Sequence, residues 1–305
     1  MIFDSESVFE ENVITVLKQH GWKDGVLRYP TERDLLDNWK GILYRNNNDI
    51  DRLGKYPLTD GEMTQIIEQI ETLRTPLALN SFVNGRTVSI TRDNKEDVAH
   101  FGKEVSLYIY DRKEIAGGKS TYQIAQQPVY PAKNKMLNSR RGDLVLLING
   151  MPLIHIELKK SGIPVSQATN QIEKYAHEGV FTGLFRLVQI FVAMNPDDAV
   201  YFANPGVDKF NPSYYFHWAD YNNEPICGGQ NPGKDEWKLF IGGTSGTAGL
   251  LSIPMAHQLI GFYTIADSAD GCLKVLRSYQ YIAANAISDV VRKLSLIHIS
   301  EPTRL

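Results

Sequence analysis

The segment that most constrains the fold is RRGDLVLLINGMPLIHIELKK, which spans residues 140–160. It contains two runs dense in Leu, Val and Ile, and the dipeptide Asn149-Gly150 joins them. Runs of this kind are typical of buried strands, and Asn-Gly between them is a strong signal for a tight turn. The segment therefore predicts a β-hairpin whose two strands lie inside the protein.

Three charged residues stand at the ends of these runs: Asp143, Glu157 and Lys159. Charged groups are costly to place on buried strands, so their presence calls for a chemical reason. Alternate residues of a strand share a face, about 6.6 Å apart, so Glu157 and Lys159 point the same way. Two carboxylates beside a lysine suit Mg²⁺, which polarises a phosphate and activates a bound water. We predict a metal-dependent phosphodiesterase site here; the alternative is an ordinary solvated face.

The register of the hairpin decides whether the two carboxylates can meet. A two-residue turn at Asn149-Gly150 pairs position 143 with position 156, which places Asp143 and Glu157 on opposite faces. A three-residue loop that includes residue 151 pairs position 143 with position 157 directly. The proposed site therefore predicts either the longer loop or a β-bulge that compensates for the shorter one.

Apolar periodicity along the rest of the chain predicts an α/β fold, with helices on the faces of a sheet. Ser166 is expected to be the N-cap of the helix that follows the hairpin. Helices are predicted over residues 7–21, 60–73, 167–177, 254–263 and 273–293. Strands, in addition to the hairpin, are predicted over residues 86–91, 105–110, 121–130, 187–194 and 199–203. Residues 204–249 are rich in Pro, Gly, Asn and aromatics, which predicts ordered loops.

Composition limits the classes of protein that fit. The 305 residues suffice for one large or two ordinary domains, and the net charge of −3 excludes a globally basic nucleic-acid binder. Cys227 and Cys272 are far apart and lack a CxxC pattern, which argues against a disulfide framework or a zinc site. The N-terminus has no signal-peptide pattern, and no apolar run approaches the roughly 18 residues of a membrane span. We expect a cytoplasmic protein.

The predicted helix after the hairpin carries Gln171 and Tyr175, which are four residues apart and share one helical face. With this helix, the hairpin resembles the nuclease core of the motor (restriction) subunit of type I restriction enzymes. In that family an Asp, a Glu-x-Lys and a downstream Gln-x-x-x-Tyr form the PD-(D/E)xK nuclease site. The resemblance assigns catalytic roles to Asp143, Glu157, Lys159, Gln171 and Tyr175, with Asp143 and Glu157 as the Mg²⁺ ligands.

The resemblance covers residues 1–293 and adds two further points about the site. Gly142 stands where the family usually has Pro, a common departure. The family's first helix carries a glutamate that faces the site; Glu10 matches it best and Glu11 is the second choice. The alternative for Glu10 is a first-turn acid that complements the helix dipole. The resemblance implies a restriction-endonuclease-like mixed central sheet flanked by helices, over residues 1–235.

Residues 236–293 are expected to form a linker and the truncated start of a helicase-type ATP motor. By resemblance, Gln280 is a candidate contact for adenine. Neither Gly118-Lys119-Ser120 nor the glycine-rich segment 242–249 fits the P-loop pattern G-x₄-G-K-[ST]. ATP is therefore expected to bind only the full-length subunit, and residues 294–305 are expected to be a non-native tail.

Basic residues around the hairpin predict contacts with DNA phosphates, without reading of the base sequence. They are Lys133, Lys135, Arg140, Arg141, Lys159 and Lys160. The expected function is Mg²⁺-dependent hydrolysis of double-stranded DNA by the endonuclease domain of a type I motor subunit, coupled to ATP-dependent translocation. The expected partners are the modification (methyltransferase) and specificity subunits, with no membrane. The alternatives are a non-catalytic module that docks DNA or the methyltransferase, and a stand-alone resolvase or repair nuclease of this fold.

Overall fold

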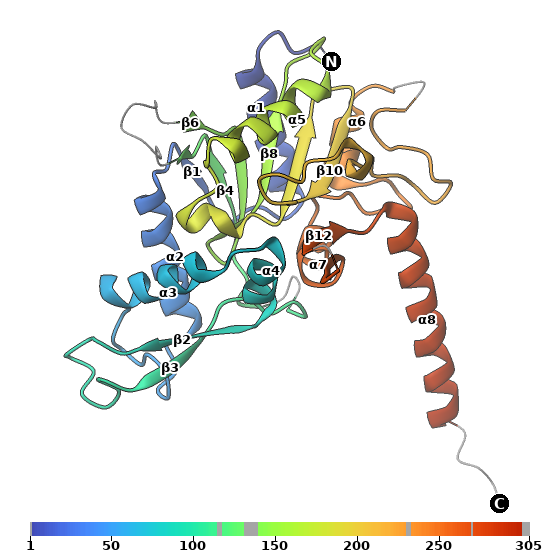
Figure 1. Cartoon of the computed structure of the whole chain (residues 1–305). Helices are drawn as coiled ribbons and strands as arrows, with labels where there is room; N and C mark the ends of the chain where they lie inside the picture. The colour runs from blue at the N-terminus through green and yellow to red at the C-terminus, as the bar shows by residue number, and fades with distance from the viewer. Residues whose placement is uncertain (1, 115–117, 131–139, 230–232, 270, 301–305) are drawn as a thin grey trace, which may run out of the picture.

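A six-stranded mixed sheet forms the centre of the computed structural model (Figure 1). The structure describes residues 2–114, 118–130, 140–229, 233–269 and 271–300. The strands, in spatial order, are β1 (Val26–Arg28), β4 (Tyr122–Gln126), β7 (Leu144–Ile148), β8 (Met151–Leu158), β9 (Ile190–Met194) and β10 (Ala199–Ala203). β1 pairs with β4 and β8 with β9 in parallel, whereas the other neighbours are antiparallel. The predicted mixed central sheet is confirmed.

The predicted hairpin is the pair β7–β8, and every residue of both strands is buried. Asn149 and Gly150 form a two-residue turn with φ angles of 53° and 83°. A Cβ on Gly150 would lie 2.9 Å from the Cα of Trp39 in α2 (Glu32–Asn46). Glycine is therefore required at this position both for its positive φ and for the close approach of α2.

A β-bulge corrects the register that the short turn sets. Leu147 pairs with Pro152 and Leu146 pairs with Ile154, so Leu153 is an extra residue in β8. The extra residue shifts all later pairs by one position, so that Leu144 faces Ile156 and position 143 comes opposite position 157. The compensating bulge that the predicted site required is confirmed.

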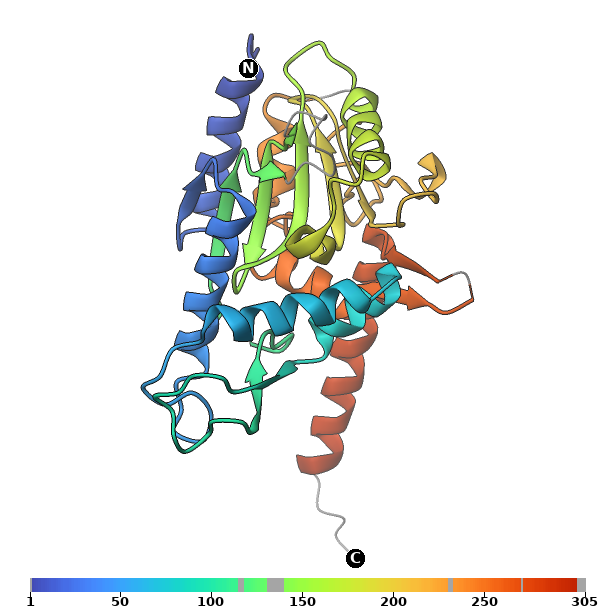
Figure 2. The same cartoon turned by 60° about the vertical axis from the view of Figure 1, so that its left-hand side comes forward.

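Helices cover both faces of the sheet, as Figure 2 shows for α1 (Glu6–Gln19) and α5 (Val165–His177) on opposite sides. α1 begins after Ser5, whose side chain accepts a hydrogen bond from the Val8 N–H. The apolar stripe of α1 joins the larger hydrophobic cluster, whereas Ala168 and Ile172 of α5 pack into a second cluster with residues of β9 and β10. Burial on both faces explains why the central strands are apolar throughout.

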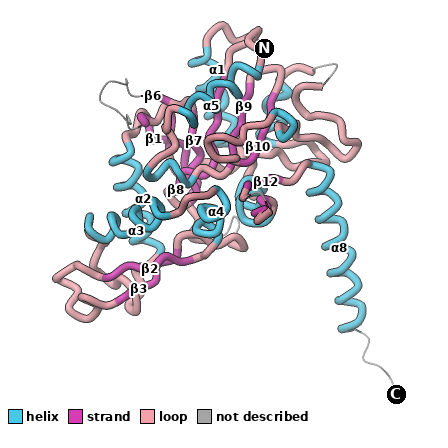
Figure 3. Tube along the Cα trace, viewed as in Figure 1, coloured by secondary structure: helices cyan, strands magenta, loops and turns pink. Residues whose placement is uncertain are grey.

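A second lobe lies below the sheet in Figure 3 and shares the larger hydrophobic cluster with it. It contains α3 (Asp60–Thr72), α4 (Pro76–Asn84) and the hairpin of β2 (Thr87–Thr91) and β3 (Glu104–Tyr108). α2 connects this lobe to the sheet, and Asn47 at the end of α2 donates to the Tyr108 carbonyl and accepts from the Tyr108 N–H.

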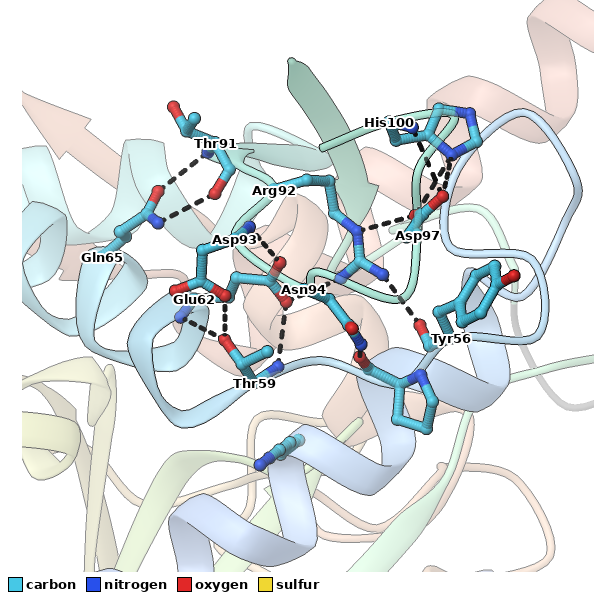
Figure 4. A network of polar contacts seen from close by, with 12 residues as sticks. Tyr56, Thr59, Glu62, Gln65, Thr91, Arg92, Asp93, Asn94, Asp97 and His100 are labelled. Carbon is cyan, nitrogen blue, oxygen red and sulfur yellow. Dashed lines mark hydrogen bonds and ion pairs between the residues drawn. The ribbon is translucent and has the colours of Figure 1, made fainter. Parts of the chain in front are cut away.

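A buried guanidinium holds the second lobe together (Figure 4). The side chain of Arg92 is fully buried and donates to Glu62 Oε2 at 2.7 Å, Asp97 Oδ2 at 3.1 Å and the Tyr56 carbonyl at 3.0 Å. His100 Nδ1 lies 3.0 Å from Asp97 Oδ1. These bonds tie α3 to the loop that follows β2, and they compensate the cost of burying the three charges.

Among the C-terminal elements, α6 (Glu236–Gly242) packs beside α1, and α7 (Met255–Phe262) and β12 (Cys272–Val275) join the larger hydrophobic cluster. α6 places Trp237 against Phe3 and Phe9, with ring centroids 5.9 Å and 5.2 Å apart. The other C-terminal elements are β11 (Thr264–Asp267) and α8 (Ser278–Ser300). The domain boundary at residue 235 and the motor character of residues 236–293 stay predictions.

α8 extends away from the rest of the protein (Figure 1). It runs through residue 300, so residues 294–300 continue the helix into the segment that was expected to be a non-native tail. Residues 301–305 lie outside the described part, and the non-native origin of 294–305 stays a prediction. Within the described ranges, no helix combines the length and the apolar character that crossing a bilayer requires.

Two predicted helix starts are wrong. The helix expected over residues 273–293 begins only at Ser278, because Leu273 and Val275 belong to β12, where pairing with β11 overrides the local helical pattern. The helix after the hairpin begins at Val165 with Pro164 as its N-cap residue, so Ser166 is not the cap. Ser166 instead lies in the first turn, where its carbonyl accepts a hydrogen bond from the Thr169 hydroxyl.

Other element boundaries also differ from the prediction. The strand expected over residues 187–194 begins at Ile190, after the 3₁₀ helix η1 (Gly183–Leu187). The strand expected over 121–130 is divided into β4 and β5 (Val129–Tyr130), because Gln127 has a φ of 47°. α2, α4, α6 and the 3₁₀ helix η2 (Pro212–Tyr214) were not predicted. α2 was signalled by its capping box and by its helically spaced Leu35, Trp39, Ile42 and Leu43, whereas α4, α6 and η2 are short.

The Arg92 network predicts a large and local loss of stability in Arg92→Met. Removing the cation leaves Glu62 buried without a counter-charge and Asp97 with His100 alone, which costs about 3–5 kcal/mol. Arg33→Met is the matched control, because Arg33 forms two ion pairs with its side chain 63% exposed; such pairs contribute about 1 kcal/mol or less. Urea unfolding, with hydrogen exchange of the β2 and β3 amides, measures both losses. Equal losses in the two variants would contradict the role of the network.

Candidate active site

The bulge in β8 brings Asp143 to the position opposite Glu157. Asp143 directly precedes β7, and its Oδ2 accepts a hydrogen bond from the Leu158 N–H at 2.7 Å. Glu157 is fully buried, and neither of its carboxylate oxygens has a hydrogen-bond partner among the described residues. A buried carboxylate that accepts no hydrogen bond is stabilised by a proton or a nearby cation, so this pair is the part of the site that most needs a ligand.

Lys159 supplies one positive charge to the acid pair. Its side chain is 9% exposed, and Nζ lies 3.6 Å from Glu157 Oε1 and 3.7 Å from Glu6 Oε1. The same Nζ donates to the Leu158 carbonyl at 2.8 Å. Lys159 is therefore near Glu157, as the shared strand face predicts. Glu6, in the first turn of α1, was not predicted to lie here.

The structure brings Glu10, and not Glu11, to the site. Glu10 is buried on the inner side of α1, where it accepts hydrogen bonds from Gln126 Nε2 at 2.5 Å and from Gln127 Nε2 at 3.2 Å. The Gln127 backbone N–H donates to the Asp143 carbonyl at 2.7 Å, so Gln127 connects Glu10 with Asp143. Glu11 is exposed and pairs with Arg28 at 2.8 Å.

The two glutamines were missed by the sequence analysis. The available signal was a pair of amides, Gln126-Gln127, at the end of an otherwise apolar strand pattern. That signal indicates only that the strand ends there. The contact with Glu10 depends on how α1 packs across β4, which local sequence does not specify.

Gln171 and Tyr175 act on the backbone that leads into Asp143. Gln171 Nε2 donates to the Tyr175 hydroxyl at 2.7 Å, and that hydroxyl donates to the Arg141 carbonyl at 2.9 Å. The accepting carbonyl is two residues before Asp143. The geometry of this pair is thus that of a brace between α5 and β6 (Arg140–Arg141).

Burial raises the pKa values of all three acids of the site. The pKa of Asp143 lies well above its usual range because of burial and then of the neighbouring Glu157, with the Leu158 N–H and Lys159 opposing. Burial raises the pKa of Glu157 to about 8, although Lys159 lowers it. The pKa of Glu10 is also raised by burial, against the hydrogen bonds from Gln126 and Gln127. The site therefore favours protons or a cation over free negative charge.

The donor set suits Mg²⁺. Within the described ranges, no group of three or more His, Cys, Asp or Glu side chains converges as a ready-made metal cage. Mg²⁺ does not need such a cage, because it keeps several waters and binds proteins through one or two carboxylates. Asp143 and the unpartnered oxygens of Glu157 provide such a pair.

The basic residues predicted to contact DNA differ in their exposure and in the partners that they already have. Arg140 forms a bidentate pair with Glu178, at 2.8 Å and 2.9 Å. Arg141 is exposed, with its guanidinium 5.8 Å from the ring centre of Tyr29. Lys160 is also exposed, and its Nζ contacts a backbone carbonyl of the N-terminal segment at 3.4 Å. Lys133 and Lys135 lie outside the described residues.

Gln280 lies in a different part of the molecule from the acids. It is exposed in the first turn of α8, and its Oε1 accepts from the Arg277 N–H at 3.0 Å. It lines a cavity of about 380 Å³ with residues of β10, β12 and the segment 205–216, but with none of Asp143, Glu157 and Lys159. Its contact with adenine stays a prediction.

The raised pKa of Glu157 predicts a pH-dependent gain of stability in Glu157→Gln without divalent cations. As pH rises from 4.5 through about 8, the unfolded chain releases this proton while the folded chain keeps it, so the wild type loses stability. The variant should match the wild type near about pH 4 and exceed it by on the order of 2–4 kcal/mol near about pH 9. Urea unfolding in a chelator measures the difference, with the exposed Glu68→Gln as control. A difference that does not change with pH would contradict the burial argument.

Comparison with known proteins gives one family. The family model described as "Type I restriction enzyme R protein N terminus" matches residues 4–210. The endonuclease subunit of the type I restriction enzyme SsaAORF53P of Staphylococcus saprophyticus is 29% identical over 295 residues. The endonuclease subunit of SauMSSORF170P of Staphylococcus aureus is 29% identical over 289 residues, and that of EcoprrI of Escherichia coli is 28% identical over 296 residues.

The matches cover nearly all of this chain but differ in their share of the relatives. The staphylococcal alignments include 94% of this chain and 27% of each relative. The Escherichia coli alignment includes 93% of this chain and 82% of the relative. The chain thus spans about a quarter of the staphylococcal proteins, and the family model covers well over half of it. The chain belongs to the family of type I restriction enzyme R protein N-terminal regions.

Proposed function

We propose that this chain is the endonuclease module of a type I restriction enzyme, with a PD-(D/E)xK site that hydrolyses phosphodiester bonds of double-stranded DNA. The observation that carries the proposal is the buried carboxylate of Glu157, which lies opposite Asp143 and beside Lys159 and has no hydrogen-bond partner among the described residues. Membership of the family, whose relatives are named as endonuclease subunits, supports it. A module that only docks DNA or the methyltransferase would gain nothing from burying these acids.

In this proposal Asp143 and Glu157 hold Mg²⁺, and Lys159 acts beside it. When bound, the ion polarises the phosphate and lowers the pKa of a bound water. The Lys159 ammonium, 3.6 Å from Glu157 Oε1, can orient a water or stabilise charge that develops on the phosphate. Tyr175, supported by Gln171, holds the backbone before Asp143. Glu10 acts through Gln127, which fixes the carbonyl of Asp143.

Arg141 and Lys160 are the best candidates for contacts with DNA phosphates, because both are exposed and neither forms a described ion pair. Arg140 contributes less in this proposal, since Glu178 offsets its charge. Contacts of this kind position the duplex and carry no sequence information, so recognition of the target falls to a separate specificity subunit.

The remaining parts of the proposal concern a longer protein. Coupling to ATP-dependent translocation, a helicase-type motor and an adenine contact at Gln280 require chain beyond the region that the staphylococcal alignments cover, which is 27% of each relative. We also propose that the full subunit assembles with modification and specificity subunits in the cytoplasm, on the basis of its family. These statements are proposals for the full subunit.

The proposed roles predict loss of cleavage in Lys159→Ala and Asp143→Ala. In the full subunit assembled with its partners, each variant should reduce Mg²⁺-dependent plasmid cleavage by at least about 10²-fold, because a transition-state charge or a metal ligand is lost. Lys174→Ala is the control, since Lys174 is 62% exposed on α5. ATP hydrolysis measured in parallel shows that the variants assemble. Cleavage at the wild-type rate by either variant would refute the assignment.

A further inference from the structure

A buried histidine lies between Glu157 and a tyrosine. His155 is fully buried on β8, two residues before Glu157 and on the same face. Its Nε2 lies 3.3 Å from Glu157 Oε2, and its Nδ1 lies 2.8 Å from the Tyr130 hydroxyl. Neither Nε2 nor Oε2 has a hydrogen-bond partner among the described residues, so their 3.3 Å approach is a close contact and not a formed hydrogen bond. The imidazole therefore lies between the tyrosine, with which it shares a hydrogen bond, and the carboxylate that it approaches.

The hydrogen-bond donors and acceptors around His155 favour one tautomer of its ring. A neutral imidazole has one donor nitrogen and one acceptor nitrogen, and an ionised carboxylate only accepts. Tyr130 keeps its hydrogen, since burial raises its pKa well above the usual range, and Nδ1 is the one acceptor described for it. If Tyr130 donates to Nδ1, the ring hydrogen lies on Nε2 and faces Glu157 Oε2. In the other tautomer the ring hydrogen lies on Nδ1, and the Tyr130 hydroxyl hydrogen has no described acceptor. The lone pair of Nε2 would then face a lone pair of Glu157 Oε2.

The surroundings fix the ring of His155 in this position. The rings of Phe181, Phe191 and Tyr175 meet it edge to face, with centroids 5.5 Å, 6.0 Å and 6.3 Å away. A Cβ on Gly142 would lie 2.5 Å from the Tyr130 hydroxyl oxygen and 2.9 Å from His155 Cε1. The glycine just before Asp143 thus makes room for the tyrosine–histidine pair.

We propose that Tyr130 and His155 position the carboxylate of Glu157 for the divalent cation. In this proposal the Nε2–H of His155, 3.3 Å from Oε2, donates to that oxygen when the ion is bound, which leaves Oε1, 3.6 Å from Lys159 Nζ, for the ion. The inference rests on the proposed function, because it takes Glu157 as a metal ligand. Tyr130 and His155 are positioning residues, since they act on the ion through Glu157. Partners of this kind orient metal ligands, and their loss weakens metal binding by about 10–100-fold.

Three variants separate positioning from packing. His155→Leu keeps an apolar side chain of similar size and removes the donor, whereas His155→Gln places an amide N–H near the position of Nε2. Tyr130→Phe removes only the hydroxyl. His257→Leu is the matched control, because His257 is a second fully buried histidine, with Nδ1 2.9 Å from the Tyr122 hydroxyl and Nε2 2.9 Å from a backbone carbonyl.

Mn²⁺ binding to the 305-residue chain, measured by electron paramagnetic resonance of the free ion, is the first readout. His155→Leu should weaken binding by about 10–100-fold, Tyr130→Phe by less, and His155→Gln should restore most of the affinity. His257→Leu should lower stability and leave the affinity unchanged. A folded His155→Leu chain that binds Mn²⁺ as the wild type does would overturn the proposal, as would a His155→Gln chain no better than His155→Leu.

The tautomer of His155, read from ¹⁵N NMR of the metal-free chain near about pH 9, where Glu157 with its pKa of about 8 is ionised, is the second readout and does not depend on metal binding. The wild type should carry the hydrogen on Nε2, and Tyr130→Phe should give a mixture of tautomers. A hydrogen on Nδ1 in the wild type would overturn the proposal. A wild-type chain that binds no Mn²⁺ would count against the proposed function, and the tautomer would then still show whether His155 presents a hydrogen to Glu157.

Discussion

The candidate site depends on one extra residue in β8. Leu153 has no partner on β7, and the shift that it introduces brings position 143 opposite position 157. Side chains alternate between the faces of a strand, so the regular register of the two-residue turn would place Asp143 and Glu157 on opposite sides of the sheet. The bulge is therefore a condition for the acid pair, and with it for any chemistry that uses both carboxylates.

The rest of the molecule supports that pair at an electrostatic cost. Burial raises the pKa values of Asp143, Glu157 and Glu10, and Lys159 offsets only part of the charge. The surrounding contacts hold backbone and carboxylates in place: Tyr175 braces the strand before Asp143, and Gln127 joins Asp143 to α1. A site of this kind is destabilising until a cation binds, so the sheet and its two hydrophobic clusters must supply the compensating stability.

The parts of the fold that follow from local sequence could be predicted, and those that depend on distant packing could not. The hairpin followed from two apolar runs and Asn-Gly, and the need for a bulge followed from requiring Asp143 and Glu157 to meet. The position of the bulge at Leu153 does not follow from local sequence, since the hairpin also pairs with β4 on one side and β9 on the other. The helix start at residue 273 was wrong because β11 captures those residues as a strand. The Arg92 network likewise joins segments that are distant in sequence.

The most direct test of the central claim is a crystal structure of this chain grown with Mn²⁺, with the ion located by its anomalous scattering. The account predicts one peak bound by carboxylate oxygens of both Asp143 and Glu157, with Lys159 beside it. Crystals in which these two carboxylates point apart and the peak is absent, at saturating Mn²⁺, would contradict the account.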